Sequence, residues 1–255
     1  MDIKQKIDRI NVYNLMIFNL TVLSIIGIIK FNWFYLINLI VAIFSAGLFD
    51  SIIYFFKTKK WKISKSGIIT GFFIGMILLN INQKDFYIPL IIGFLAIILK
   101  HTIKYMLSLF KQNTIIFNPA ILGIFIATLF FSSTDGWWGA SNLWMIIILG
   151  IFLVYKFKRF DLVLSFLISY FIISAIIGIN FISILSSTTI YFFAFFMLTE
   201  PKTTPFKKTG KIVYGILTAK IIILISKTQF SAYSLTAGLL LSNISVPIIN
   251  KFSKV

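Results

Sequence analysis

Long apolar runs separated by short basic segments dominate the chain. The runs are rich in Phe, Ile and Leu, and they reach about 26 residues. They are too long for buried strands and lack the alternation of outer-membrane barrel strands. Helices satisfy their own backbone in lipid. The pattern therefore predicts an all-α polytopic membrane protein with about ten transmembrane helices. These lie near residues 14–29, 31–56, 67–83, 86–100, 115–132, 142–155, 161–179, 181–199, 211–226 and 229–249.

Composition supports lipid as the solvent. Of 255 residues, 59% are apolar and 12% charged, and the mean hydropathy is +0.98. More spans follow the first apolar run, so we expect it to be a helix rather than a removable signal peptide. The chain has no Cys, which excludes disulfides and thiolate-bound iron–sulfur clusters. Its single His excludes a multi-histidine metal or haem site.

The basic residues are distributed unevenly between the two predicted sides. Twenty of the 24 Lys and Arg residues fall on the side of both termini, whereas Lys30, Lys84 and Lys227 face the other side. This bias predicts cytoplasmic termini and basic loops in an inner (cytoplasmic) membrane. The net charge of +17 then reflects topology and contact with anionic membrane lipids, rather than nucleic-acid binding.

No polar linker divides the chain, so residues 1–255 are expected to form a single integral membrane domain. Cutting after the fifth span leaves halves 12–132 and 142–250, each with five spans. An odd number of spans makes the halves enter the membrane from opposite sides, which is a 5+5 inverted repeat. Segments 66–78 and 186–198 share Ser, a Phe-Phe pair and Leu at a constant offset, although Phe is common throughout this chain.

A glycine motif interrupts the third apolar run. Gly67, Gly71 and Gly75 recur every four residues on one helical face. This spacing lets another helix or a ligand approach closely, and helix packing is the favoured interpretation.

Two polar motifs follow further along the chain. Asn118 precedes Pro119, which removes a helical hydrogen bond and predicts a broken or tilted helix. The only glutamate, Glu200, lies between two threonines and two prolines at the end of a span. The alternative interpretation of that segment is a capped helix terminus followed by a turn.

Charged residues within spans need partners or a hydrated cavity. Asp50 and Lys220 are predicted to lie inside spans, and we interpret them as a structural ion pair or, for Lys220, a snorkelling lysine. The alternative is a role in an ion or proton path. His101, at a predicted span boundary, is interpreted as an interfacial residue rather than a ligand.

In their order and spacing, these motifs resemble the RnfD/NqrB family. Its members are the membrane-embedded D component of the Rnf electron-transport complex and the B component of the sodium-translocating NADH:quinone oxidoreductase. The resemblance runs from about Lys62 to Asn250. The segments that carry it are Ser66 to Gly71 (SGIITG), Phe117 to Ala120 (FNPA), Thr199 to Pro205 (TEPKTTP) and Asn243 to Ile249 (NISVPII).

The resemblance implies a ten-helix inverted repeat distantly similar to urea channels, and a flavin in the membrane domain. In the family, an Asp-Gly-x-Ser-Gly-Ala-Thr motif outside the cytoplasm carries the flavin phosphate on its Thr. The corresponding stretch is TDGWWGASNL, on a loop that the charge bias also places outside. Ser141 stands where the acceptor Thr would be. The matching residues are Asp135, Gly136, Gly139 and Ala140.

The stretch departs from the family motif at two positions. Trp138 replaces the usual Ser, and Ser141 replaces the Thr, which puts covalent attachment in doubt. The cofactor, FMN or riboflavin, is then bound covalently or non-covalently, or has been lost. The alternative interpretation is an interfacial turn whose Trp137 and Trp138 anchor helix ends at the headgroup level.

The leading hypothesis is a flavin-carrying membrane subunit that relays electrons across the bilayer in an Rnf-like or quinone-reductase-like ion-translocating complex. We expect Asn118, Thr199, Glu200 and Thr203 to shape an intramembrane site. No dinucleotide-binding glycine motif is present, so the chain would have no complete active site and would depend on other subunits. The alternative is a channel or carrier for a small polar solute on the same scaffold.

Overall fold

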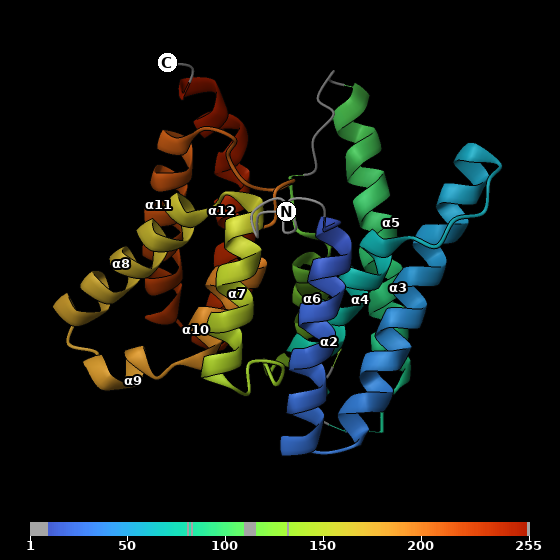
Figure 1. The fold of residues 1–255 in the computed structure, drawn as a ribbon, viewed down its shortest axis with the longest axis horizontal. Coiled ribbons are helices and arrows are strands. Elements are labelled where there is room, and N and C mark those ends of the chain that lie inside the picture. The colour runs from blue at the N-terminus through green and yellow to red at the C-terminus, as the bar shows by residue number, and fades with distance from the viewer. Residues whose placement is uncertain (1–9, 81, 83, 110–115, 132, 254–255) are drawn as a thin grey trace, which may run out of the picture. The chain divides into compact units, whose positions relative to one another are not determined.

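The computed structural model describes residues 10–80, 82, 84–109, 116–131 and 133–253, most of them in helices (Figure 1). The protein is an all-α polytopic membrane protein, as predicted. Five described helices are long and apolar enough to cross a membrane, and five apolar helices are shorter. The long ones are Val12–Lys30, Phe34–Thr58, Tyr87–Ser108, Lys208–Ser226 and Ser231–Phe252. The expected total of ten spans therefore stays a prediction.

Contacts divide the chain into two compact units. Unit 1 contains residues 1–113 and 119–141, and unit 2 contains residues 114–118 and 142–255. In unit 1 the element order is α2 (Val12–Lys30), α3 (Phe34–Thr58), α4 (Lys65–Ile77), β1 (Leu78–Asn80), α5 (Tyr87–Leu109), α6 (Pro119–Phe130) and β2 (Ser133–Asp135). Helix α5 corresponds to the fourth predicted span, 86–100, and extends nine residues beyond its predicted end at residue 100.

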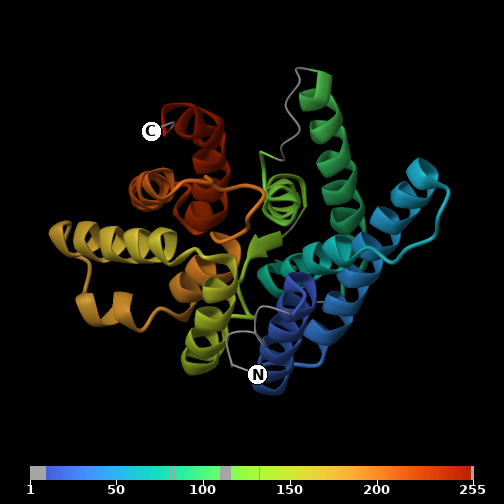
Figure 2. The ribbon, with the colours of Figure 1, turned by 45° about the horizontal axis from the view of Figure 1, so that its top comes forward.

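Helices α3 and α4 pack closely along the glycine motif, side by side in Figure 2. A Cβ on Gly67 would lie 2.6 Å from the Ala46 carbonyl oxygen, and one on Gly71 would lie 2.6 Å from that of Ala42. A Cβ on Gly75 would lie 2.7 Å from the Leu39 Cα. The helix-packing interpretation of this motif is therefore confirmed, because each glycine faces the backbone of α3.

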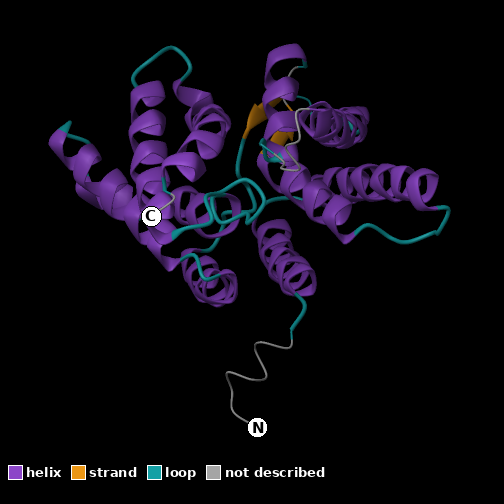
Figure 3. Cartoon of the chain, turned by 90° about the horizontal axis from the view of Figure 1, so that it is seen from above, coloured by secondary structure: helices purple, strands orange, loops and turns teal. Residues whose placement is uncertain are grey.

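The third predicted span, 67–83, is wrong as a continuous helix, since α4 ends at Ile77 and β1 follows. Strand β1 pairs antiparallel with β2, and Leu79 lies opposite Thr134 (orange in Figure 3). Thirteen helical residues span about 20 Å and three extended ones about 10 Å, together close to the hydrocarbon thickness. The ladder supplies backbone hydrogen bonds where the helix stops, as a broken span requires.

Unit 2 begins with α7 (Leu143–Phe157) and α8 (Phe160–Ile176), and ends with α11 and α12 packed against each other (orange and red in Figure 2). The predicted span 181–199 is wrong as one helix. The chain turns at Ser186 and Ser187, which separate a five-residue helix from a second short helix whose last turn is a π-helix. The remaining elements are α9 (Phe181–Leu185), α10 (Thr188–Phe192), the π-helix η1 (Phe193–Met197), α11 (Lys208–Ser226), η2 (Ser231–Tyr233) and α12 (Ser234–Phe252).

Three helix pairs of unit 1 have counterparts in unit 2. In unit 1, α2 contacts α4, α3 contacts α5, and α5 contacts α6. In unit 2, α7 contacts α10, α8 contacts α11, and α11 contacts α12. The contact of α4 with α6 in unit 1 has no comparable counterpart between the described residues of α10 and α12, so the 5+5 inverted repeat stays a prediction.

Candidate functional site

A polar turn lies in unit 2 where the broken span ends. The π-helix η1 ends at Met197, and its last turn closes with the Leu198 amide donating to the Phe193 carbonyl at 2.9 Å. Single-turn π-helices are uncommon and occur often at functional sites. Glu200 follows directly, and its Oε2 accepts a hydrogen bond of 2.7 Å from Asn118 Nδ2. Two motifs 82 residues apart thus meet side by side.

The threonines of this turn hold its backbone. The Thr199 hydroxyl donates to the Phe195 carbonyl at 2.7 Å, and the Thr204 hydroxyl donates to the Glu200 carbonyl at 2.9 Å. The Thr203 amide and hydroxyl also approach the Glu200 carbonyl, at 3.3 and 3.5 Å. Asn118 and these three threonines are at most 2% exposed. These hydrogen bonds hold the backbone of the turn around the partly buried Glu200.

Sequence reasoning missed Arg159 as part of this region. It lies between α7 and α8, is 5% exposed, and its Nη1 donates to the Pro205 carbonyl at the end of the turn. Burial lowers the pKa of the Arg159 guanidinium. In the sequence, Arg159 contributes only to the positive charge that predicts the topology. Its position at the start of a helix after a Lys-rich turn gave no sign of a buried partner.

The turn resembling the flavin motif lies in unit 1 and caps the broken helix α4. The four carbonyls at the end of a helix have no partner within it. The Leu78 amide donates to the Ile74 carbonyl, and the Trp138 Nε1 donates to that of Gly75 at 2.6 Å. The Gly139 amide donates to the Met76 carbonyl at 3.1 Å, and the Gly136 amide to that of Ile77 at 2.7 Å.

Packing explains several residue types in this turn. A Cβ on Gly139 would lie 2.9 Å from the Met76 Cβ, and one on Gly136 would lie 2.7 Å from the Leu79 Cβ. Trp137 and Trp138 are 7% and 4% exposed. The alternative in which they anchor helix ends at headgroup level is wrong, because both rings pack inside the unit. Asp135 lies in β2, opposite Leu78, and accepts from the Trp137 Nε1 at 3.3 Å.

Ser141 ends this turn with a buried hydroxyl. Its Oγ is inaccessible and has no hydrogen-bond partner among the described residues. Its carbonyl accepts from the Lys30 Nζ at 3.1 Å, which ties the turn to the end of α2. Phosphoester formation needs an accessible hydroxyl, so the turn in this conformation does not present Ser141 to a flavin. The structure groups Asp135, Gly139 and Ser141 in unit 1, and Asn118, Thr199, Glu200 and Thr203 in unit 2.

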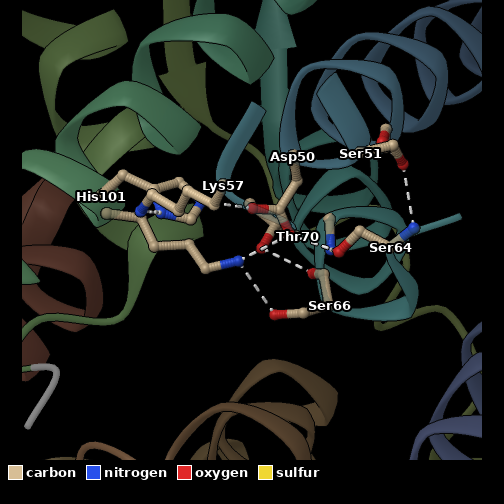
Figure 4. A network of polar contacts seen from close by, with 10 residues as sticks. Asp50, Ser51, Lys57, Ser64, Ser66, Thr70 and His101 are labelled. Carbon is tan, nitrogen blue, oxygen red and sulfur yellow. Dashed lines mark hydrogen bonds and ion pairs between the residues drawn. The ribbon is translucent and has the colours of Figure 1, made fainter. Parts of the chain in front are cut away.

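A buried ionic network connects α3, α4 and α5 in unit 1 (Figure 4). Asp50 Oδ2 accepts from the Lys100 Nζ at 2.8 Å and from the Ser64 hydroxyl, and Oδ1 lies 2.6 Å from the His101 Nε2. The Lys100 Nζ also donates to the Ser66 hydroxyl at 3.1 Å. The Asp50 and Lys100 side chains are 6% and 8% exposed.

This network corrects two predictions. The pairing of Asp50 with Lys220 is wrong, because Lys100, His101 and Ser64 already engage both carboxylate oxygens. The purely interfacial interpretation of His101 is wrong, because its imidazole bonds to Asp50. Both predictions failed because the sequence analysis made the fourth span, which is α5 in the structure, too short. Ending it at residue 100 placed both residues at a boundary rather than inside α5.

Known proteins are similar to the part of the chain that contains these motifs. The model of the NQR2, RnfD, RnfE family matches residues 100–255. A protein of Actinobacillus succinogenes, named as the D component of an ion-translocating oxidoreductase complex, is 38% identical over 79 residues, which are 30% of this chain and 22% of that protein. A protein of the same name from Haemophilus influenzae strain PittEE is 29% identical over 127 residues, 47% of this chain and 35% of that protein. The matches thus span about a third or less of these curated relatives.

Proposed function

The chain belongs to the NQR2, RnfD, RnfE family, and we propose from this premise that it is a membrane subunit of an ion-translocating oxidoreductase complex. In this role it relays electrons across the bilayer by means of a flavin, and other subunits supply the electron donor and acceptor. The names of the two relatives support the complex. Both termini and the basic loops face the cytoplasm in this proposal, as the charge bias predicts.

The observation that carries the proposal is the hydrogen bond between Asn118 and Glu200. It joins two of the motifs on which the resemblance depends, and both lie within the matched residues. A carboxylate fixed at a broken helix is a group that interacts with a cation crossing the membrane. We propose that Asn118 and Glu200, framed by Thr199 and Thr203, form the intramembrane polar site of this subunit.

Composition supports an organic redox group. An electron relay needs a redox centre, and a chain without Cys and with one His cannot ligate an iron–sulfur cluster by thiolates or a bis-histidine haem. A flavin carries one or two electrons and needs no metal ligand. The buried hydroxyl of Ser141 does not fit a flavin phosphoester in the turn as folded. The flavin itself is what the family resemblance implies, and we propose that it is FMN or riboflavin held without a covalent bond to Ser141.

The test begins with flavin in the purified protein. Protein expressed with its neighbouring reading frames should be yellow and fluorescent, and denaturation should release the flavin, so that no fluorescence follows the band on a denaturing gel. Fluorescence in the band that disappears in Ser141→Ala would instead establish the covalent anchor. Colourless protein that accelerates the flux of a small polar solute into liposomes would favour the channel or carrier.

The second test concerns the polar site. Glu200→Gln keeps the shape and the acceptor for Asn118 but removes the charge. We expect this variant to retain flavin while ion translocation by the complex falls. Asp161→Asn is the matched control, because Asp161 is a partly exposed carboxylate in the first turn of α8 that pairs with the exposed Lys208. Equal translocation by both variants would remove Glu200 from the proposal.

A further inference from the structure

The ionic network of unit 1 forms a continuous polar path from the surface to a buried carboxylate. Lys57, near the end of α3, is exposed, and its Nζ lies 3.1 Å from the His101 Nδ1. The His101 side chain is 22% exposed, and its Nε2 lies 2.6 Å from the Asp50 Oδ1. Dashed lines in Figure 4 mark the contact of His101 with Lys57 and its contact with Asp50. The path starts at the basic loop 57–65, which is expected to be cytoplasmic.

The partners of His101 fix its tautomer. A lysine ammonium has donors only, so the Nδ1 that it contacts must be the acceptor. The Nε2 then carries the proton and donates it to the Asp50 carboxylate. In this tautomer the imidazole has an acceptor towards the surface and a donor towards the interior. This arrangement can pass one proton inward without rotating the ring, and passage of that proton back to the surface restores the starting tautomer.

We propose that His101 transfers protons between the surface and Asp50. When the Lys57 ammonium moves away, a hydronium ion at the surface gives its proton to Nδ1 and becomes water. The Nε2–H bond then breaks, and its proton joins the Asp50 Oδ1. The imidazole is again neutral, now with its proton on Nδ1, and the carboxylate has become a carboxylic acid. One proton enters the path and one reaches Asp50, so charge and atoms balance.

Transfer of a proton to Asp50 affects the ion pair that joins α3 and α5. The charged groups that face the network are Lys57 from α3 and Lys100 from α5. Helix α4 and its N-cap contribute the hydroxyls of Ser66 and Ser64, while Lys65 of α4 points away to Asn14 of α2 at 2.7 Å. Protonation of Asp50 removes the counterion of Lys100 and leaves that ammonium with Ser66. The ion pair between α3 and α5 therefore weakens when the proton arrives.

The proposed function supplies the use of the transferred proton, which is ion translocation, and the inference rests on it in this respect. The inference identifies the proton as the ion that the network of Lys57, His101 and Asp50 handles. The relay itself can be measured without partner subunits. His101 is the only histidine. Protein labelled with nitrogen-15 histidine therefore gives the signals of a single imidazole.

The first experiment is nitrogen-15 NMR of the wild-type chain in bilayers between about pH 5 and 8, the range in which imidazole changes charge. At the upper end we expect a neutral ring with the proton on Nε2. On acidification Nδ1 should gain a proton. A single Nδ1–H tautomer, or a ring that is cationic throughout, would overturn the proposal, because no acceptor would then face the surface.

The second experiment compares His101→Gln with Lys104→Gln in the complete complex in liposomes. The Gln amide nitrogen replaces Nε2 and still donates to Asp50, but cannot relay a proton. Lys104 is exposed on the same helix and is the control. We expect redox-driven acidification or alkalinisation of the lumen to slow about a hundredfold in His101→Gln, as removal of a positioned proton carrier does, with electron transfer kept.

The outcomes separate the two proposals. Electron transfer with an unchanged pH response in His101→Gln would overturn the relay and leave the proposed function intact. If the wild-type complex transfers no electrons, the proposed function fails, and the NMR result alone decides the relay. A pH response that is lost equally in Lys104→Gln would also overturn the relay, because the effect would not belong to His101.

Discussion

Replacement of Trp138 tests whether the turn after β2 caps helix α4. Trp138 is 4% exposed, and its Nε1 donates to the Gly75 carbonyl at 2.6 Å. Trp138→Phe keeps an aromatic ring in the same place but removes this donor. The Gly75 carbonyl is buried and belongs to the last turn of the helix, so water cannot readily replace the lost partner.

The expected loss follows from two contributions. A buried carbonyl left without its hydrogen bond costs about 1–3 kcal/mol. The smaller ring leaves a void that costs about 1 kcal/mol more. We therefore expect Trp138→Phe to lower the free energy of unfolding by about 2–4 kcal/mol.

The assay is equilibrium unfolding in mixed micelles, followed by circular dichroism. Trp144→Phe is the matched control, because Trp144 is 73% exposed on α7, and we expect a change within about 0.5 kcal/mol. Equal stability of the two variants would refute the capping argument. If that equal stability lies well below the stability of the wild type, loss of a tryptophan at either position lowers the free energy of unfolding, and the bond to Gly75 has no special role.

The other predictions concern packing, accessibility and the polar turn. Gly71→Ala should lower the free energy of unfolding by about 1–3 kcal/mol through overpacking against α3. Gly47→Ala should be near neutral, because its Cβ would meet only the Ile68 side chain, at 3.3 Å. A reversed order of melting temperatures would contradict this prediction. In this cysteine-free chain, Ser141→Cys should react slowly with an impermeant maleimide and the exposed Lys84→Cys quickly; equal rates would show that the turn is open. Arg159→Met should cost about 1–3 kcal/mol by leaving the Pro205 carbonyl without its donor, and unchanged micelle unfolding would exclude this role.

Sequence predicted the helices where apolar runs were long and flanked by polar residues. It also predicted the packing of α4, because Gly67, Gly71 and Gly75 lie on one face. It failed to predict the end of α4 at Ile77, since Leu78 and Leu79 continue the apolar run and carry no breaking signal. The partner of β1 lies more than fifty residues later in β2. Local periodicity contains no information about such pairing.

The contacts of the candidate site were also predicted only in part. Pro119 indicated a broken or tilted helix, and the segment around Glu200 indicated a polar end of a span. In the structure α6 begins at Pro119, and Asn118 and Glu200 lie 2.7 Å apart. The partners of Asp50 were missed, because an ion pair between helices depends on how those helices pack. The role of Trp138 was missed for a similar reason. Its indole bonds to a carbonyl 63 residues earlier, whereas the sequence suggested only a ring near the membrane surface.

The capping of α4 by a later segment has a consequence for synthesis of the chain. When α4 leaves the ribosome, the residues that bind its last carbonyls, including Trp138 and Gly139, have not yet been made. Until they arrive, these carbonyls must remain in contact with water or with the insertion machinery, because lipid offers them no donor. Stable lateral release of this helix therefore follows translation of α6 and β2, and truncation between α4 and β2 should leave an intermediate that is not fully inserted.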